Sequence, residues 1–88
     1  MAGFMGGSAP AMANQVSEGY ILMSGHTIKG YSPADLNALR QELEKLQREV
    51  RAEVPPQDDA LANQARNRKI GRLSSALQVV NAALMTRR

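Results

Sequence analysis

Two stretches of this sequence place large apolar residues at alternating spacings of three and four positions, and no other feature limits the fold so strongly. The first stretch consists of Leu36, Leu39, Leu43, Leu46 and Val50. The second consists of Ile70, Leu73, Leu77, Val80 and Leu84. A period close to 3.5 residues predicts two helices, each of which buries one narrow apolar face against a partner helix.

The segment "VPPQDD" between the two stretches predicts a reversal of the chain. Pro55 cannot continue a helix and biases Val54 away from helical backbone angles. Asp58 or Asp59 suits the start of the following helix. We therefore expect helices over 33–54 and 59–86, joined by a loop over 55–58.

A reversal about Pro56 fixes which apolar residues face each other. The expected pairs are Leu43 with Ile70, Leu39 with Leu73, and Leu36 with Leu77. At about 1.5 Å per residue, the end of the second helix then extends beyond the first by roughly one to two turns. That end needs a covering from residues 20–31 or from another subunit.

The start of the first long helix is marked by "YSPADL". Ser32 is the expected N-cap, Pro33 suits the first helical position, and Asp35 at the third position completes an acidic capping box. Tyr31 and Leu36 flank the cap at the spacing of a hydrophobic staple, which fixes the angle at which the chain enters the helix.

The residues before this helix predict a β-ribbon and an arm. In "GYILMSGHTIKGY", residues 19–31, two apolar or β-branched runs flank Ser24 and Gly25, which is typical of a hairpin. Residues 1–18 are rich in Gly, Ala, Met and Ser and contain Pro10, so we expect a flexible or partner-docked extended arm. The predicted fold is mainly α: an antiparallel two-helix hairpin preceded by a short β-hairpin and this arm, with residues 19–88 as a single small domain.

The composition limits what holds this chain together. A chain of 88 residues buries only about 60 to 65% of its unfolded surface. It has no Cys and a single His, His26, so we expect no disulfide and no metal site. Oligomerisation is therefore the expected source of further stability. The absence of a long apolar run and of a signal-peptide pattern predicts a cytosolic protein without a membrane segment.

No arrangement of residues predicts catalysis. Ser24, His26 and Asp35 have no spacing that joins a nucleophile, a base and an orienting group. The glycines match no phosphate-binding loop. We therefore expect neither an enzyme nor a cofactor.

One basic cluster could contact an anionic partner. It consists of Arg66, Arg68, Lys69 and Arg72, and residues 60–88 contain no acidic side chain. These charges wrap around the helix, which favours solvation or contact with protein over contact with nucleic acid. Gly71 within the cluster costs about 1 kcal/mol relative to Ala and marks either a close approach of another backbone or a tolerated irregularity.

The segment "SGHTIKGYSPADLNALRQELEKLQREV", residues 24–50, resembles the small head-tail joining proteins of tailed bacteriophages, of the lambda W type. The resemblance rests on Gly25, Ser32, Asp35, Leu36, Leu39, Leu43 and Leu46. In that family a β-hairpin leads through a capped turn into an amphipathic helix, and another helix precedes the hairpin. The resemblance implies a ring-forming adaptor between portal and tail in a virion assembled in the host cytoplasm.

Three functions remain open at this point. The first is a structural assembly subunit, a virion connector that contacts copies of itself and a portal or tail component. The second is a small basic protein that binds nucleic acid, or acts as a regulator, through Arg66–Arg72. The third is a subunit of a secretion needle, because those chains are similar in length and join two helices by a loop that contains Pro.

Overall fold

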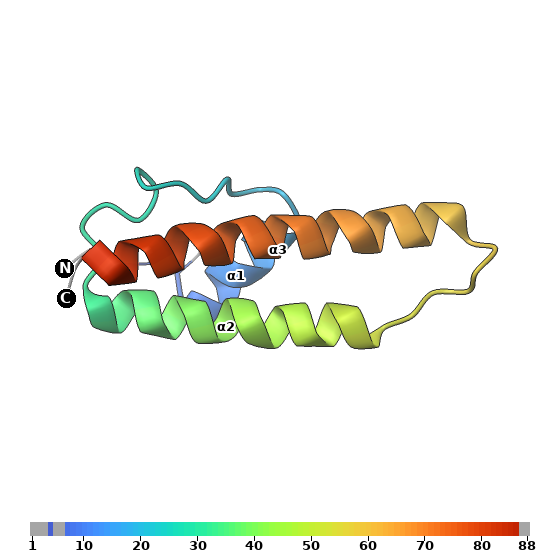
Figure 1. Ribbon diagram of the computed structural model, residues 1–88, viewed down its shortest axis with the longest axis horizontal. Coiled ribbons are helices and arrows are strands. Elements are labelled where there is room, and N and C mark those ends of the chain that lie inside the picture. The colour runs from blue at the N-terminus through green and yellow to red at the C-terminus, as the bar shows by residue number, and fades with distance from the viewer. Residues whose placement is uncertain (1–3, 5–6, 87–88) are drawn as a thin grey trace.

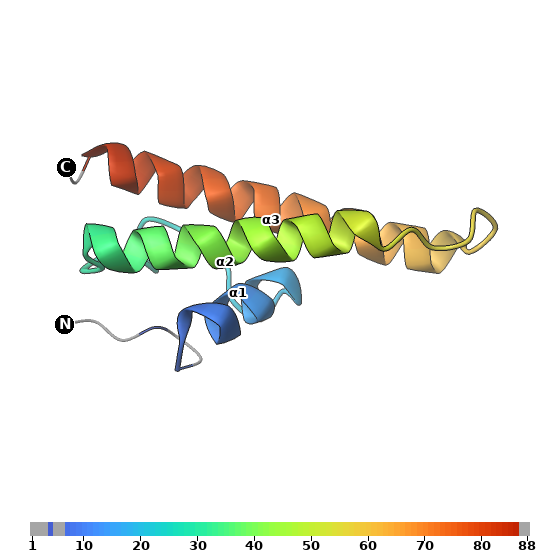
Figure 2. The same cartoon turned by 90° about the horizontal axis from the view of Figure 1, so that it is seen from below.

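The computed structural model describes residues 4 and 7–86, and this part of the chain folds into three α-helices. They are α1 (Ala9–Ser17), α2 (Pro33–Ala52) and α3 (Ala60–Thr86). α2 and α3 lie side by side and antiparallel along the longest dimension of the molecule, which measures 46 × 23 × 18 Å (Figure 1). α1 packs against both, in the half of the pair that lies away from the α2–α3 loop (Figure 2).

The start of α2 is held by reciprocal hydrogen bonds. The Asp35 backbone N–H donates to Ser32 Oγ, and the Ser32 N–H donates to Asp35 Oδ2, both over 3.1 Å. Pro33 occupies the first turn, where its missing N–H costs nothing. Tyr31 and Leu36 on either side of this capping box are both buried. The chain therefore enters α2 at a fixed angle.

The predicted β-hairpin over 19–31 is wrong, because the described residues contain no strand. The favoured two-residue hairpin loops need a positive φ at one or both central positions, and neither Ser24 nor Gly25 has one. Instead Ser24 Oγ lies 3.0 Å from Thr27 Oγ1, and Thr27 Oγ1 donates to the Leu22 carbonyl over 2.9 Å. These side-chain bonds fold the segment into consecutive turns.

The predicted extended arm is also wrong, because residues 9–17 form α1. Ser8 Oγ caps this helix by accepting from the Ala11 N–H over 3.2 Å. Pro10, which suggested a poor helix, lies in the first turn, where proline is well tolerated. Met12, Ala13 and Val16 are buried in the same core as α2 and α3. Residues 9–17 thus belong to the single folded unit, while residues 1–3 and 5–6 of the predicted arm lie outside the described residues.

α1 ends in a complete Schellman motif. The Gly19 N–H donates to the Val16 carbonyl over 3.1 Å, and the Tyr20 N–H donates to the Gln15 carbonyl over 2.9 Å. Gly19 has a φ of +86°, which glycine adopts without strain. The helix therefore stops sharply, and the chain turns into the segment 20–32.

The residues of the two apolar stretches divide by depth. Leu36, Leu39, Leu43, Leu73 and Val80 are fully buried. Leu46, Val50, Leu77 and Leu84 are partly buried and pack against the same core, whereas Ile70 is intermediate in exposure and lies outside that group. The core thus lies nearer the α1 half of the molecule.

The register of α2 against α3 differs from the predicted one. Gln47 Nε2 donates to Ser74 Oγ over 2.8 Å and to the Ile70 carbonyl over 3.5 Å. Arg66 Nε donates to the Val50 carbonyl over 3.2 Å. These pairs are centred near residues 58–60, not on Pro56. α2 ends at Ala52 because Glu53 is already extended, with a ψ of 100°, so the loop is longer than predicted.

The longer loop moves the extra turns of α3 to its other end. The last turns of α3 lie level with the start of α2, and the segment 20–32 runs beside them (Figure 1). Ile28 of that segment and Val79, Ala83 and Thr86 of α3 line a common hollow. It is the first turns of α3 that extend beyond the end of α2.

Candidate interaction surfaces

Two members of the predicted basic cluster hold the end of α1. Arg72 Nη1 donates to the Ser17 carbonyl over 3.0 Å, and Lys69 Nζ lies 3.0 Å from Glu18 Oε1. Carbonyls in a last helical turn lack partners within the helix, and the helix dipole favours a cation there. Arg72 and Lys69 therefore dock α1 on α3.

A third member of the cluster, Arg66, holds the end of α2. Its Nε donates to the Val50 carbonyl over 3.2 Å, and its Nη2 donates to the Arg51 carbonyl over 2.8 Å. Both carbonyls belong to the last turn of α2. Arg66 thus ties the second helix end to α3, just as Arg72 ties the first.

Arg68 is the remaining member of the cluster, and its side chain is exposed. No hydrogen bond or ion pair joins it to another described residue. The structure therefore brings the four basic side chains together on α3 but uses three of them within the chain. The sequence could not show this, because the ends of α1 and α2 that face the cluster were not known.

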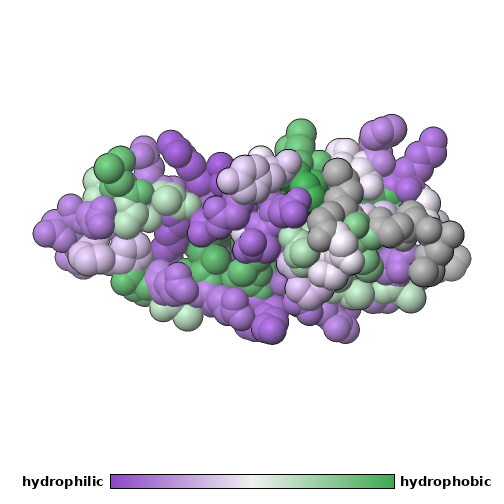
Figure 3. All heavy atoms as spheres, turned by 180° about the vertical axis from the view of Figure 1, so that it is seen from behind, coloured by the Kyte–Doolittle hydropathy of each residue, from purple (hydrophilic) through white to green (hydrophobic). Residues whose placement is uncertain are grey.

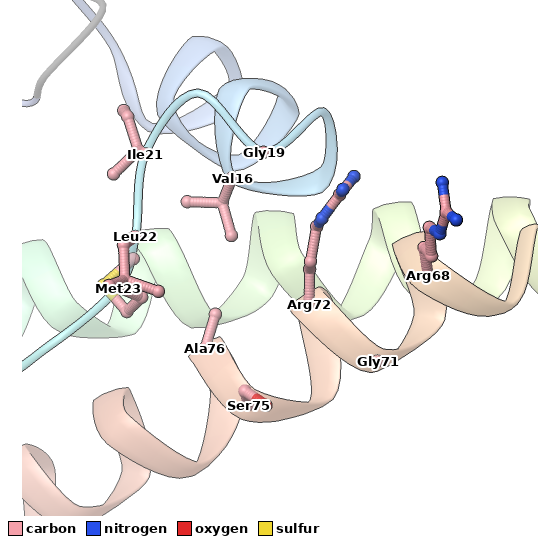
Figure 4. Close-up of a pocket in the computed structure, with 10 residues that line it drawn as sticks. All are labelled: Val16, Gly19, Ile21, Leu22, Met23, Arg68, Gly71, Arg72, Ser75 and Ala76. Atoms are coloured by element: carbon pink, nitrogen blue, oxygen red, sulfur yellow. The ribbon is translucent and has the colours of Figure 1, made fainter. Parts of the chain in front are cut away.

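Arg68 and Arg72 stand beside an apolar groove, which we call the α3 groove. It has a volume of about 490 Å³ and is lined by Val16, Gly19, Ile21, Leu22, Met23, Arg68, Gly71, Arg72, Ser75 and Ala76. Figure 4 shows the two arginines projecting side by side from α3, while Val16 and Leu22 approach from α1 and the following segment. Leu22 is 87% exposed at its rim.

Gly71 lies in the α3 groove with open space above it. A Cβ atom added at this position meets no atom within 4 Å. Within the described chain, no backbone approaches Gly71 closely. A close approach by another backbone would therefore have to come from another molecule. Otherwise Gly71 is a tolerated irregularity of the helix.

A second groove, which we call the distal groove, lies at the loop end of the α2–α3 pair. It has a volume of about 400 Å³ and is lined by Val50, Glu53, Val54, Pro55, Ala62, Ala65, Arg66 and Lys69. Lys69 also binds Glu18, the C-cap residue of α1, so this groove begins where α1 ends. Figure 3 views the molecule from behind, so the loop end lies at the left. There, hydrophobic residues lie between hydrophilic ones.

Ser24, His26 and Asp35, for which the sequence predicted no catalytic arrangement, lie in turns or in a helix cap. Ser24 bonds to Thr27, and Asp35 accepts from the Ser32 N–H, while His26 is exposed in a turn. Among the described residues, no group of three or more His, Cys, Asp or Glu side chains could hold a metal ion. The two grooves are therefore the strongest candidates for a functional surface.

Comparisons with known proteins find no matching family model, no matching curated protein and no matching solved structure. Over residues 4 and 7–86, no helix is both long enough and apolar enough to cross a membrane.

Proposed function

We propose that this protein is a non-enzymatic structural subunit that assembles with copies of itself through protein–protein contacts. The observation that carries the proposal is the open distal groove. α1 covers the cleft between α2 and α3 over one half of its length, and no other described residue covers the distal groove in the other half. Val54 and Leu61 at this end are 76% and 79% exposed. Exposed apolar residues that gather into one contiguous patch rimmed by polar side chains mark protein interaction sites.

The narrower form of the proposal is a bacteriophage head-tail connector, which contacts a portal or tail component in a virion assembled in the host cytoplasm. It rests on the resemblance of residues 24–50, whose capping box and buried leucines are features of the folded chain. A helix, α1, precedes the turn segment, as one does in that family, although the turn segment itself is not a hairpin.

The geometry favours assembly over binding of nucleic acid. A phosphate-binding surface needs free cations, and Arg66, Lys69 and Arg72 already bind groups of this chain. Contact with a phosphate backbone would have to compete with the bonds that fix α1 and α2. Arg68 alone is a weak basis for such binding.

Light scattering after gel filtration, together with electron microscopy of the full chain, tests the proposal. We expect a discrete symmetric oligomer whose mass is a whole multiple of the chain mass. A monomer at every concentration would contradict self-assembly. A ring with a central opening is the form that the connector role requires. Strong, salt-dependent binding to DNA that is lost in Arg68→Ala would instead favour the nucleic-acid function.

A further inference from the structure

We propose that the loop tip of one copy of the chain, which we define as residues 53–61, docks in the α3 groove of another copy. This inference rests on the proposed assembly function and identifies one contact for it. The contact joins two different surfaces, so each copy offers its tip to one neighbour and its groove to the next. Contacts of this kind close into rings or extend into filaments.

The α3 groove combines an apolar end with a cationic end. Val16, Leu22 and Met23 gather at one end, and Arg68 and Arg72 project at the other (Figure 4). The two arginines are the only charged residues in its lining. Neither has a carboxylate partner within the described chain. The occupant that fits this groove is therefore both apolar and acidic.

The loop tip offers that combination. Val54 and Leu61 are 76% and 79% exposed. The acids of the tip are Glu53, Asp58 and Asp59, and the tip contains no basic side chain. All three acids are exposed, and none of them pairs with a cation within the described chain. Each of the two surfaces therefore supplies the charge that the other lacks.

The exposed apolar residues point to the same pairing. In the described part of the chain, the exposed large hydrophobic residues are Tyr20, Leu22, Val54, Leu61 and Met85. Leu22 lies at the rim of the α3 groove, and Val54 and Leu61 belong to the tip, so docking covers three of them together. A contact between two grooves would oppose cations, and a contact between two tips would oppose acids. Only the tip with the groove is complementary.

The tip docks in another copy because it cannot reach the groove of its own chain. Leu61 and Arg68 belong to one continuous helix, whose rise holds them about 10 Å apart. The tip lies at the end of the long axis, away from α1 (Figure 2). In the groove, a Cβ added at Gly71 meets no atom within 4 Å, so a neighbouring chain can approach the α3 backbone there.

Two variants each block one side of the contact. Gly71→Leu fills the groove, and the open space at this position lets the monomer accept the larger side chain. Leu61→Lys removes an apolar side chain from the tip and adds a cation that faces the arginines. We expect sedimentation velocity of the full chain to show an oligomer for the wild type. Each variant is expected to weaken it by about tenfold or more.

A charge variant of the groove has a matched control. Arg68→Glu turns the exposed cation of the groove into an acid that opposes the acids of the tip, and we expect a similar weakening. Arg48→Glu makes the same charge change on the exposed surface of α2, outside both contact surfaces, and leaves the oligomer unaffected. Helical circular dichroism checks the folding of every variant.

Mixing the two blocked variants tests whether a second copy is the occupant. Gly71→Leu keeps an intact tip, and Leu61→Lys keeps an intact groove. An equimolar mixture is therefore expected to form a dimer with one chain of each kind, and no larger species. If Gly71→Leu unfolds, Arg68→Glu takes its place in the mixture.

The remaining outcomes contradict the proposal in distinguishable ways. A mixture that stays monomeric while both variants are folded overturns the contact, and so does an oligomer that Arg68→Glu and Arg48→Glu weaken equally. A wild-type oligomer that persists unchanged in Gly71→Leu or in Leu61→Lys overturns this contact alone and leaves self-assembly standing. A wild-type chain that is monomeric at every concentration overturns both this contact and the proposed self-assembly.

Discussion

Arg72 donates through Nη1 to the carbonyl oxygen of Ser17, 3.0 Å away and 55 positions earlier in the chain. The bond joins the last turn of α1 to the middle of α3. A guanidinium at this place satisfies a carbonyl that the helix itself cannot pair, and its charge is favoured by the helix dipole. Arg72 thus acts together with Lys69 to hold the end of α1 on α3.

Replacing Arg72 with Met removes this donor and keeps an apolar stem of similar length. We expect the free energy of unfolding to fall by about 1 to 3 kcal/mol, because the bond involves a charged group and is partly buried. Urea unfolding followed by circular dichroism measures the loss. Arg68→Met is the matched control, since Arg68 is exposed, and we expect a change within about 0.5 kcal/mol. Equal stability of the two variants would show that the bond to Ser17 contributes nothing.

Replacing Gly19 with Ala disturbs the end of α1 in two ways. The φ of +86° is unfavourable for alanine, and its Cβ would lie 3.0 Å from the Arg72 guanidinium carbon. We expect a loss of about 1 to 2 kcal/mol in thermal or urea unfolding. Gly25→Ala is the control, because Gly25 has no positive φ and open space around it. A loss at position 25 as large as that at 19 would contradict the Schellman geometry.

Replacing Ser32 with Ala removes the N-cap of α2. The expected cost is about 0.5 to 2 kcal/mol, because the N–H of Asp35 loses its acceptor. Thermal unfolding measures it. Ser75→Ala, on the exposed surface of α3, makes the same chemical change and is expected to be neutral or slightly stabilising. An unchanged stability in Ser32→Ala would mean that the capping box is not formed in solution.

Two leucines of α3 give opposite expectations for the same substitution. Leu73 is fully buried, and Leu73→Ala is expected to cost about 2 to 5 kcal/mol through lost burial and a residual cavity. Leu61 is 79% exposed, so Leu61→Ala is expected to change the stability of the monomer by less than about 0.5 kcal/mol. Chemical denaturation of dilute protein compares them. Similar costs at both positions would contradict the position of the core.

Gly71→Ala tests whether anything approaches this part of α3. Within the chain a Cβ at this position has open space, so we expect the monomer to gain about 0.5 to 1 kcal/mol from better helix propensity. Unfolding and oligomer mass are measured on the same samples. A destabilised monomer would show that the space is filled within the chain. A stabilised monomer that no longer assembles would instead place a neighbouring molecule at Gly71.

The parts of the fold that depend on adjacent residues could be predicted from the sequence. The cap of α2 is formed by Ser32 and Asp35 alone, so its geometry follows from their spacing. The start of α1 carried a similar local signal in Ser8 and Pro10, but the helix is short and its glycine-rich surroundings suggested an arm. The residues around Ser24 were compatible with either a hairpin turn or side-chain hydrogen bonds. The bonds of the Thr27 hydroxyl to Ser24 and Leu22 give the consecutive turns that are observed.

The parts that depend on distant residues could not be predicted in the same way. The register of α2 against α3 follows from the extended backbone of Glu53, which shortens α2 and lengthens the loop. The roles of Arg66 and Arg72 follow from where two helices end in space. The distal groove likewise exists because α1 is shorter than the cleft in which it lies, and no local pattern reports that difference.

The bond between Ser17 and Arg72 also sets an order of events during translation. α1 is synthesised before α3. The carbonyl of Ser17 in its last turn therefore has no bond to Arg72 until 55 further residues have been added. Until then α2 but not α3 is present to cover Met12 and Val16, since α1 packs against both helices in the complete fold. A chain cut short before Arg72 therefore lacks the bond that ties the end of α1 to α3.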